Sequence, residues 1–154
     1  DLDMTTITPS TPKEFPYYEN ISVRYADLDT LRHVNNIAIL EYVETARTGY
    51  YRASGIWDGK IKEGFGMLVA SIKIDYLASI QFGDPVRVGI KVGHLGTKSL
   101  RFRFQVENSD NEQIFARGEV VMVAYNQTEE QSMPVSQAWR EKLALFENNQ
   151  ELLA

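Results

Sequence analysis

Cysteine is absent from this chain of 154 residues, and histidine occurs only twice. Without cysteine the chain has no disulfide, no thiolate nucleophile and no cysteine-ligated zinc or iron–sulfur site. Because His33 and His94 do not have the spacing of metal ligands, we expect no metal and no cofactor, and we interpret His94 as structural. A chain without cysteine also fits a reducing compartment, so a cytoplasmic location is expected.

Long apolar runs and an excess of positive charge are missing as well. No segment approaches the roughly 20 apolar residues that a membrane span needs, and residues 1–16 lack the basic start and apolar centre of a signal peptide. The net charge of −5 argues against nucleic acid as a partner. The sequence has no Gly-x-Ser-x-Gly, phosphate-loop, dinucleotide or His-Glu-x-x-His motif, which disfavours serine hydrolases, nucleotide hydrolases and zinc proteases.

The remaining pattern predicts one domain at residues 17–147, between a flexible N-terminal tail (1–16) and a C-terminal tail (148–154). A short strand is expected at residues 21–25, where apolar and polar residues alternate. A helix of about 19 residues follows from Asn36 to the residue before Gly55. Its apolar positions recur every three to four residues: Ile37, Leu40, Val43, Ala46 or Arg47, and Tyr50.

After residue 65 the apolar period changes from 3.6 to 2, which predicts strands. Four antiparallel strands that meander in chain order are expected at residues 68–76, 86–92, 100–106 and 113–125, with a last helix opening at Pro134 and Ser136. One long helix must then cover one face of a curved sheet, so the predicted class is α+β with a hotdog arrangement. The strand at 113–125 is apolar on both faces, which suggests that a partner subunit covers it.

The segment from Arg24 to Asn36 has the highest density in the sequence of side chains that can transfer protons or bind an oxyanion. Asp27 and Asp29 precede the start of a helix, where aspartate often serves as a cap or offsets the helix dipole. Because Asn35 or Asn36 can cap this helix instead, we favour a catalytic role for Asp29, as a general base or as a nucleophile. His33 is either a structural histidine or a substrate contact.

The start of the predicted helix adds an electrophilic group to this segment. Free backbone N–H groups and the positive end of the dipole can stabilise a developing oxyanion near Asn36. The segment can therefore provide both groups that an acyl transfer needs, a carboxylate as base or nucleophile and N–H groups that stabilise the oxyanion.

Basic residues are concentrated in the strand region. Residues 86–117 contain six cations and three anions, a local balance of +3 in a chain of −5. Such residues commonly form a solvated outer strand face. The alternative is a phosphate-binding surface, for which Lys98, Ser99 and Arg101 beside the turn at Gly96 are the candidates.

Residues 27–36 read Asp-Leu-Asp-Thr-Leu-Arg-His-Val-Asn-Asn, and the helix continues with Leu-Glu-Tyr-Val-Glu-Thr-Ala-Arg at 40–47. These motifs closely resemble the 4-hydroxybenzoyl-CoA thioesterase family of hotdog proteins, and the corresponding segment of plant acyl-ACP thioesterases. The resemblance extends over most of residues 18–125. The chain departs from its relatives at three positions: Leu31, Arg32, where many have glycine, and Ile39.

The resemblance implies a thioesterase that cleaves acyl-CoA or acyl-ACP, with Asp29 as the catalytic carboxylate and His33 assisting. Asn35 and Asn36 would lie beside the thioester carbonyl, and the basic residues from Lys98 to Arg103 near the coenzyme A phosphates. The family also implies a homodimer or homotetramer whose active sites are shared between subunits. Two alternatives remain open, a non-catalytic acyl-CoA-binding protein and a hotdog dehydratase.

Overall fold

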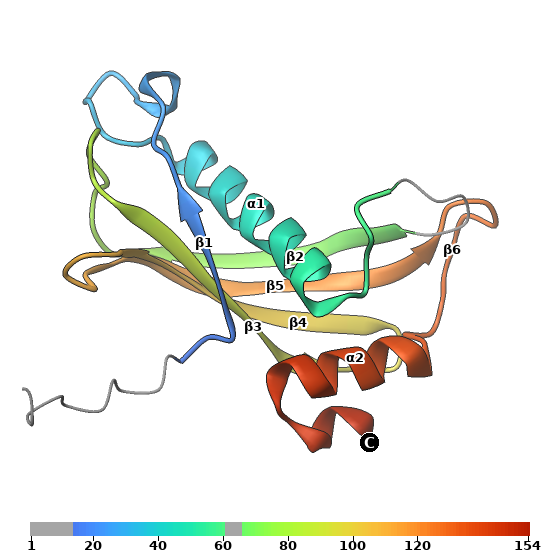
Figure 1. The fold of residues 1–154 in the computed structure, drawn as a ribbon. Coiled ribbons are helices and arrows are strands. Elements are labelled where there is room, and N and C mark those ends of the chain that lie inside the picture. The colour runs from blue at the N-terminus through green and yellow to red at the C-terminus, as the bar shows by residue number, and fades with distance from the viewer. Residues whose placement is uncertain (1–13, 61–65) are drawn as a thin grey trace, which may run out of the picture.

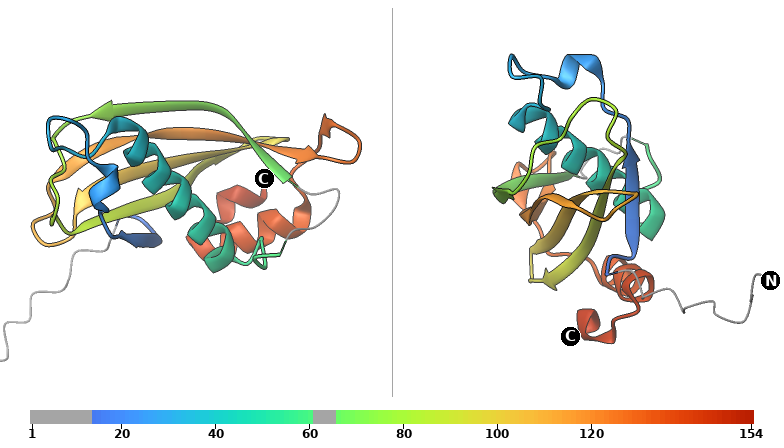
Figure 2. Two further views of the ribbon diagram at one scale, coloured as in Figure 1. Left: turned by 90° about the horizontal axis from the view of Figure 1, so that it is seen from above. Right: turned by 90° about the vertical axis from the view of Figure 1, so that its left-hand side faces the viewer.

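The computed structural model describes residues 14–60 and 66–154, and a curved antiparallel sheet wraps around one long helix (Figure 1). In chain order the elements are β1 (Tyr17–Ile21), η1 (Tyr25–Asp27), α1 (Asn36–Ser54), β2 (Gly66–Tyr76), β3 (Val86–Leu95), β4 (Ser99–Asn108), β5 (Ile114–Asn126), β6 (Gln131–Ser132), α2 (Gln137–Glu147) and η2 (Gln150–Leu153). Helix α2 lies near the end of the sheet at which α1 finishes (Figure 2). The predicted hotdog arrangement and α+β class are confirmed.

Helix α1 begins and ends where the sequence predicts, over 19 residues. The side chain of Asn35 accepts a hydrogen bond from the N–H of Ile37 at 2.8 Å, which caps the first turn. Gly55 ends the helix with a left-handed φ of 85°, a conformation that costs glycine little. The apolar face differs at its start, because Ile37 is 66% exposed while Ala38 and Ile39 are buried.

The core lies between α1 and the concave face of the sheet. Alternate residues of β3 and β4 point toward the helix, and Tyr50 makes edge-to-face contacts with Phe102 of β4 and Phe146 of α2, at ring-centroid distances of 5.3 and 5.1 Å. Burial of such large apolar side chains is a main source of the stability of the fold.

The sheet order corrects the prediction of a simple meander. The order is β1-β3-β4-β5-β2, so that β2 pairs with the last long strand β5 and not with β3, its neighbour in sequence. Strands β3, β4 and β5 do meander. The physical reason is that α1 spans the concave face between β1 and β2, which places these two strands at opposite edges of the sheet (Figure 1).

The first strand and its tail also differ from the prediction. Strand β1 occupies Tyr17–Ile21, whereas Tyr25 begins the short helix η1. Phe15, inside the predicted N-terminal tail, is buried beside Tyr18 of the strand, and Glu14 pairs with Arg103 at 3.1 Å. Residues 1–13 of that tail lie outside the described residues.

The predicted C-terminal tail at 148–154 is wrong for most of its length. Asn148 ends α2 in a left-handed conformation, and the chain turns back into η2. Leu152 of η2 joins the hydrophobic core, because burying its side chain outweighs the entropy of ordering a short turn. No helix in the described part of the chain is long and apolar enough to span a membrane.

Candidate active site

The segment between β1 and α1 folds into a tight loop that leads into the helix. The backbone N–H of Asp29 donates to the carbonyl of His33 at 2.8 Å, and the N–H of Arg32 donates to the carbonyl of Asp29 at 3.0 Å. The backbone N–H of Val34 donates to the carbonyl of Ile80, and the backbone N–H of Asn35 donates to the carbonyl of Asp27. The bond from Val34 to Ile80 connects the loop to the segment before β3, so that side chains from both segments share one site.

Asp27 is the structural carboxylate of the pair. Its side chain is 2% exposed and accepts the Tyr42 hydroxyl at 2.7 Å, the Arg24 backbone N–H at 2.9 Å and the Arg24 guanidinium at 2.8 and 3.1 Å. Burial raises the pKa of Asp27, but these hydrogen bonds outweigh burial and hold the pKa below its ordinary value. Asp27 is therefore an ionised anchor that joins the loop to α1.

Asp29 has the opposite environment. Its carboxylate is exposed, and Oδ1 accepts the N–H groups of Leu31 at 2.9 Å and His33 at 3.3 Å. Within the described residues no donor bonds Oδ2. The backbone thus orients this carboxylate while one oxygen stays available to a water molecule or to a carbonyl carbon.

His33 and Asn36 lie beside Asp29, as the sequence predicts. Both line a hollow of about 270 Å³ together with Asp29. The N–H of Ile37 is taken by the Asn35 side chain, while the N–H of Asn36 stands at the first helical position, where a helix provides no acceptor. Asn35 is thus a cap, and Asn36 leads the exposed helix start.

The opposite wall of this hollow could not be found from the sequence. It comes from the end of β2 and the following segment, residues 76–80, and the Tyr76 hydroxyl donates to the carbonyl of Asn36 at 3.3 Å. The alternation of β2 predicts a strand, but no local signal places the end of that strand against the start of α1. A second hollow of about 500 Å³ is lined by Tyr25, Leu28, Asp29, Arg32, Gln81 and Phe82. Asp29 borders both hollows.

Arg32 has a left-handed φ of 64°. Glycine adopts this conformation without cost, whereas another residue pays roughly 1 kcal/mol. The glycine that the family resemblance implies at this position would adopt the same conformation without strain.

Lys98, Ser99 and Arg101 are not brought to Asp29 within one chain. They lie at the β3–β4 turn and the start of β4, whereas Asp29 lies by the start of β3. Ser99 pairs with Val123 of β5, and Val123 pairs in turn with Leu68 of β2. Ser99 therefore lies across the sheet from the start of β2. Arg101 pairs with Glu119 at 3.6 Å on the exposed face of the sheet. Among the described residues, no group of three or more histidine or acidic side chains could hold a metal ion.

Comparisons with known proteins agree with this geometry. The model of the thioesterase-like superfamily matches residues 23–143. The uncharacterized protein YsmA of Bacillus subtilis is 30% identical over 109 residues, which cover 71% of this chain and 72% of that protein.

Two solved structures resemble the fold over most of their length. A thioesterase from Thermus thermophilus, complexed with coenzyme A and Zn, is 34% identical with a TM-score of 0.75, over 88% of this chain and 97% of that one. The PA5185 protein of Pseudomonas aeruginosa is 26% identical with a TM-score of 0.78, over 88% and 95%. From the match to the family model over most of its length, together with its hotdog fold, the chain belongs to the thioesterase-like superfamily.

Proposed function

We propose that the protein hydrolyses acyl-CoA thioesters, with Asp29 as the catalytic carboxylate. The observation that carries the proposal is the convergence of an exposed, backbone-oriented carboxylate and a free helix start on one hollow. Membership of the thioesterase-like superfamily and the similarity to a structure that holds coenzyme A support the choice of substrate.

In the proposed reaction the thioester carbonyl lies at the start of α1, with its oxygen toward the backbone N–H of Asn36. Asp29 either accepts a proton from a water molecule that attacks the carbonyl carbon, or attacks that carbon itself through Oδ2. The C–S bond breaks, the thiolate leaves as the thiol after it takes up a proton, and the product is the free acid. In the second route water then cleaves the anhydride formed on Asp29. His33 borders the same hollow and contacts the substrate.

We further propose that two copies pair through β2. Strand β2 bonds to β5 on one side, and its other edge has no partner within the described part of the chain. Exposed apolar side chains gather on and just after it: Leu68, Val69, Ile72, Tyr76 and Leu77. An exposed edge of 11 residues with such side chains is a template for another strand, and a second copy of the same strand fits it in an antiparallel pair.

Antiparallel pairing would also bring the predicted coenzyme A residues closer to a catalytic site. The start of β2 in one copy would lie beside the end of β2 in the other copy, where Asp29 and Tyr76 lie. Lys98 and Ser99 are level with the start of β2 and two strands away, which is about 10 Å across the sheet. The shared sites implied by the family resemblance would follow from this arrangement.

Thiol release tests the chemistry. Wild type is expected to release thiol from at least one member of a panel of acyl-CoAs, from acetyl to palmitoyl with benzoyl and phenylacetyl added. Asp29→Asn is expected to lower kcat by at least about 100-fold with an unchanged circular dichroism spectrum. Asp110→Asn, at an exposed turn far along the chain from the site, is the matched control. A folded Asp29→Asn protein with wild-type activity would refute the role of Asp29.

The same acyl group presented on acyl carrier protein distinguishes the carriers, because a higher kcat/KM there would reassign the substrate to acyl-ACP. Light scattering of the purified protein tests the pairing. Ile72→Lys, at an exposed position of β2, is expected to convert dimers to monomers. The thiol-release activity should fall as well, because the proposed sites are shared between two copies. A monomeric wild-type protein would contradict the pairing.

A further inference from the structure

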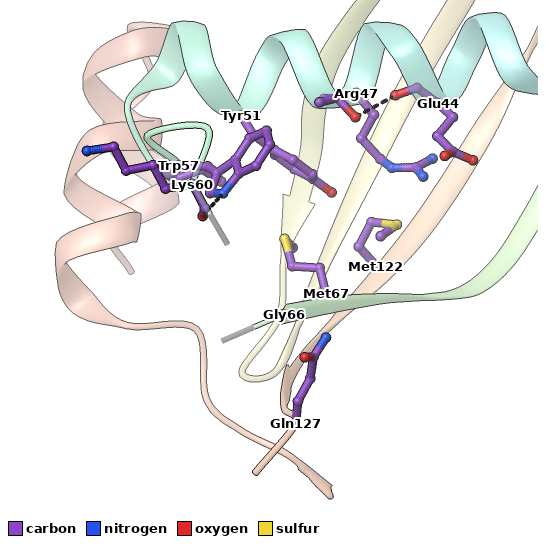
Figure 3. Close-up of a pocket in the computed structure, with 11 residues that line it drawn as sticks. Glu44, Arg47, Tyr51, Trp57, Lys60, Gly66, Met67, Met122 and Gln127 are labelled. Atoms are coloured by element: carbon purple, nitrogen blue, oxygen red, sulfur yellow. Dashed lines mark hydrogen bonds between the residues drawn. The ribbon is translucent and has the colours of Figure 1, made fainter. Parts of the chain in front are cut away.

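A separate cavity lies at the other end of α1, between the helix, residues 56–60 after it, and the facing ends of β2 and β5 (Figure 3). Its volume is about 310 Å³, within the range of small-molecule sites. Arg47 and Tyr51, one turn apart on α1, point into it above Met67 of β2 and Met122 of β5.

Arg47 is a largely buried cation that faces the cavity, and the described residues provide no ion-pair partner for it. The residue is 7% exposed, and no carboxylate of the described residues lies within ion-pairing distance of its guanidinium. Burying a charge without a partner costs several kcal/mol, so proteins usually pair such a group or use it to bind a ligand. Glu44, a turn earlier, lines the same cavity but remains exposed.

The hydroxyl of Tyr51, beside the Arg47 guanidinium, is a second polar group of this cavity whose hydrogen bonds are incomplete. Its hydroxyl oxygen is fully buried and has no hydrogen-bond partner of good geometry in the structure. Burial raises the pKa of this hydroxyl, and the Arg47 guanidinium beside it offsets only part of the rise, so the group stays protonated at neutral pH. Arg47 can only donate, so the O–H of Tyr51 has no acceptor in the structure, and a buried hydroxyl without one is rare in native proteins.

The two groups together define the chemistry of an occupant. A guanidinium and a phenolic O–H both donate, and one carboxylate can accept from both. The two methionines provide an adaptable apolar wall for a carbon chain. The side chain of Lys60, the other cation at this cavity, points away from it (Figure 3).

We infer that this cavity binds the far end of an acyl group that carries a carboxylate, so that the preferred substrate is the thioester of a dicarboxylic acid. Arg47 and Tyr51 bind the free carboxylate, and Met67 and Met122 contact the chain. This inference rests on the proposed function for its connection to chemistry.

In the proposed dimer the cavity is better placed to serve the Asp29 site of the second copy than the Asp29 site of its own chain. Along α1, Arg47 is 11 residues beyond Asn36, about 16 Å at the helical rise, and Tyr51 lies farther on. Gly66 and Met67, at the start of β2, line the cavity, while Tyr76, at the end of β2, lines the Asp29 hollow. Antiparallel pairing of two β2 strands would therefore place this cavity next to Asp29 of the second copy.

Binding of free acids tests the cavity without any need for hydrolysis. Trp57 lines it and its indole N–H donates to the carbonyl of Lys60, so its fluorescence reports occupancy, and Trp57→Phe identifies its share of the signal. The full chain is titrated with octanedioate and with octanoate. In parallel, kcat/KM is measured for the corresponding carboxyl-ended and methyl-ended acyl-CoAs of six, eight and ten carbons.

Wild type is expected to bind octanedioate at least about 10-fold more tightly than octanoate. Arg47→Met should weaken octanedioate binding by about 10- to 100-fold and leave octanoate binding in place, which also shows that the variant is folded. Tyr51→Phe, a milder change, should weaken it by about 3- to 10-fold. Arg52→Met, at an exposed cation on the same helix, should change neither.

Three results would overturn the inference: equal or tighter binding of octanoate by wild type, no binding of either acid, or an unchanged preference in Arg47→Met and Tyr51→Phe. Asp29-dependent hydrolysis with no preference for carboxyl-ended substrates would remove this inference and leave the proposed function. An Arg47-dependent preference in binding without hydrolysis of any thioester would remove the proposed function and leave the carboxylate-binding cavity.

Discussion

Replacing Asp27 by alanine is expected to lower the free energy of unfolding by about 3 kcal/mol. The change leaves the hydroxyl of Tyr42, a residue that is 6% exposed, without its acceptor, which costs about 1–3 kcal/mol. Loss of the bond from the Arg24 backbone N–H adds about 1 kcal/mol. The Arg24 guanidinium adds less than about 1 kcal/mol, because that side chain is 67% exposed and water replaces its partner.

A double-mutant cycle separates the Tyr42 bond from the rest. Tyr42→Phe alone is expected to cost about 1.5 kcal/mol, because Asp27 keeps its bonds from Arg24. The double variant should be no less stable than Asp27→Ala, since it removes the orphaned hydroxyl together with the carboxylate. Urea unfolding followed by circular dichroism measures all four proteins.

The pH dependence provides a further check on the same carboxylate. Because the pKa of Asp27 is lowered in the folded protein, its contribution is present above the pKa of the unfolded chain and is lost as pH falls through the folded value. The stability gap between wild type and Asp27→Ala should therefore shrink below about pH 4. A gap under about 1 kcal/mol at pH 7, or strictly additive effects in the cycle, would refute the anchoring role.

Two other positions give tests that are independent of substrate. Glu147 accepts the Tyr50 hydroxyl at 2.9 Å and the N–H of Val92, and burial raises its pKa above the ordinary value. A raised pKa means that folding favours the protonated acid, so wild type should lose stability relative to Glu147→Gln as pH rises from about 4.5 toward neutrality; parallel stability curves from urea titrations would count against this. Arg32→Gly should raise the free energy of unfolding by up to about 1 kcal/mol by relieving the left-handed φ, and a loss of stability would show that the Arg32 side chain makes a compensating contact.

The local parts of the fold could be predicted because their causes lie within a few residues. The cap at Asn35 and the left-handed end at Gly55 were found correctly, since both follow from hydrogen bonds that one helix end requires. The paired meander of β3 to β5 follows from alternation and short turns. For the same reason the sequence brings Asp29, His33 and Asn36 to one hollow, because they belong to one loop and the helix start it leads into, while their roles stay predictions.

What failed was the placement of segments that are distant in sequence. Strand β2 was expected beside β3, because alternation predicts a strand but not its neighbour. Residues 148–154 were expected as a C-terminal tail, because a short turn that packs only through Leu152 has no periodic pattern. The N-terminal strand was placed four residues too late, since the apolar alternation of residues 21–25 continues beyond the true β1 into η1. The assignment of Lys98, Ser99 and Arg101 to the substrate stays a prediction.

By itself the sequence determined the α1 boundaries, the alternating strands and the cluster of polar groups before the helix, because these depend on capping, periodicity and chain proximity. Only the tertiary structure decided that Asp27 is an anchor while Asp29 is exposed, since that difference arises from Tyr42, which is 15 residues away. Only the tertiary structure placed Tyr76 against Asn36 and turned Arg47 and Tyr51 toward Met67 and Met122. Long-range packing sets which groups lose water and which partners replace it, and a linear pattern does not contain that information.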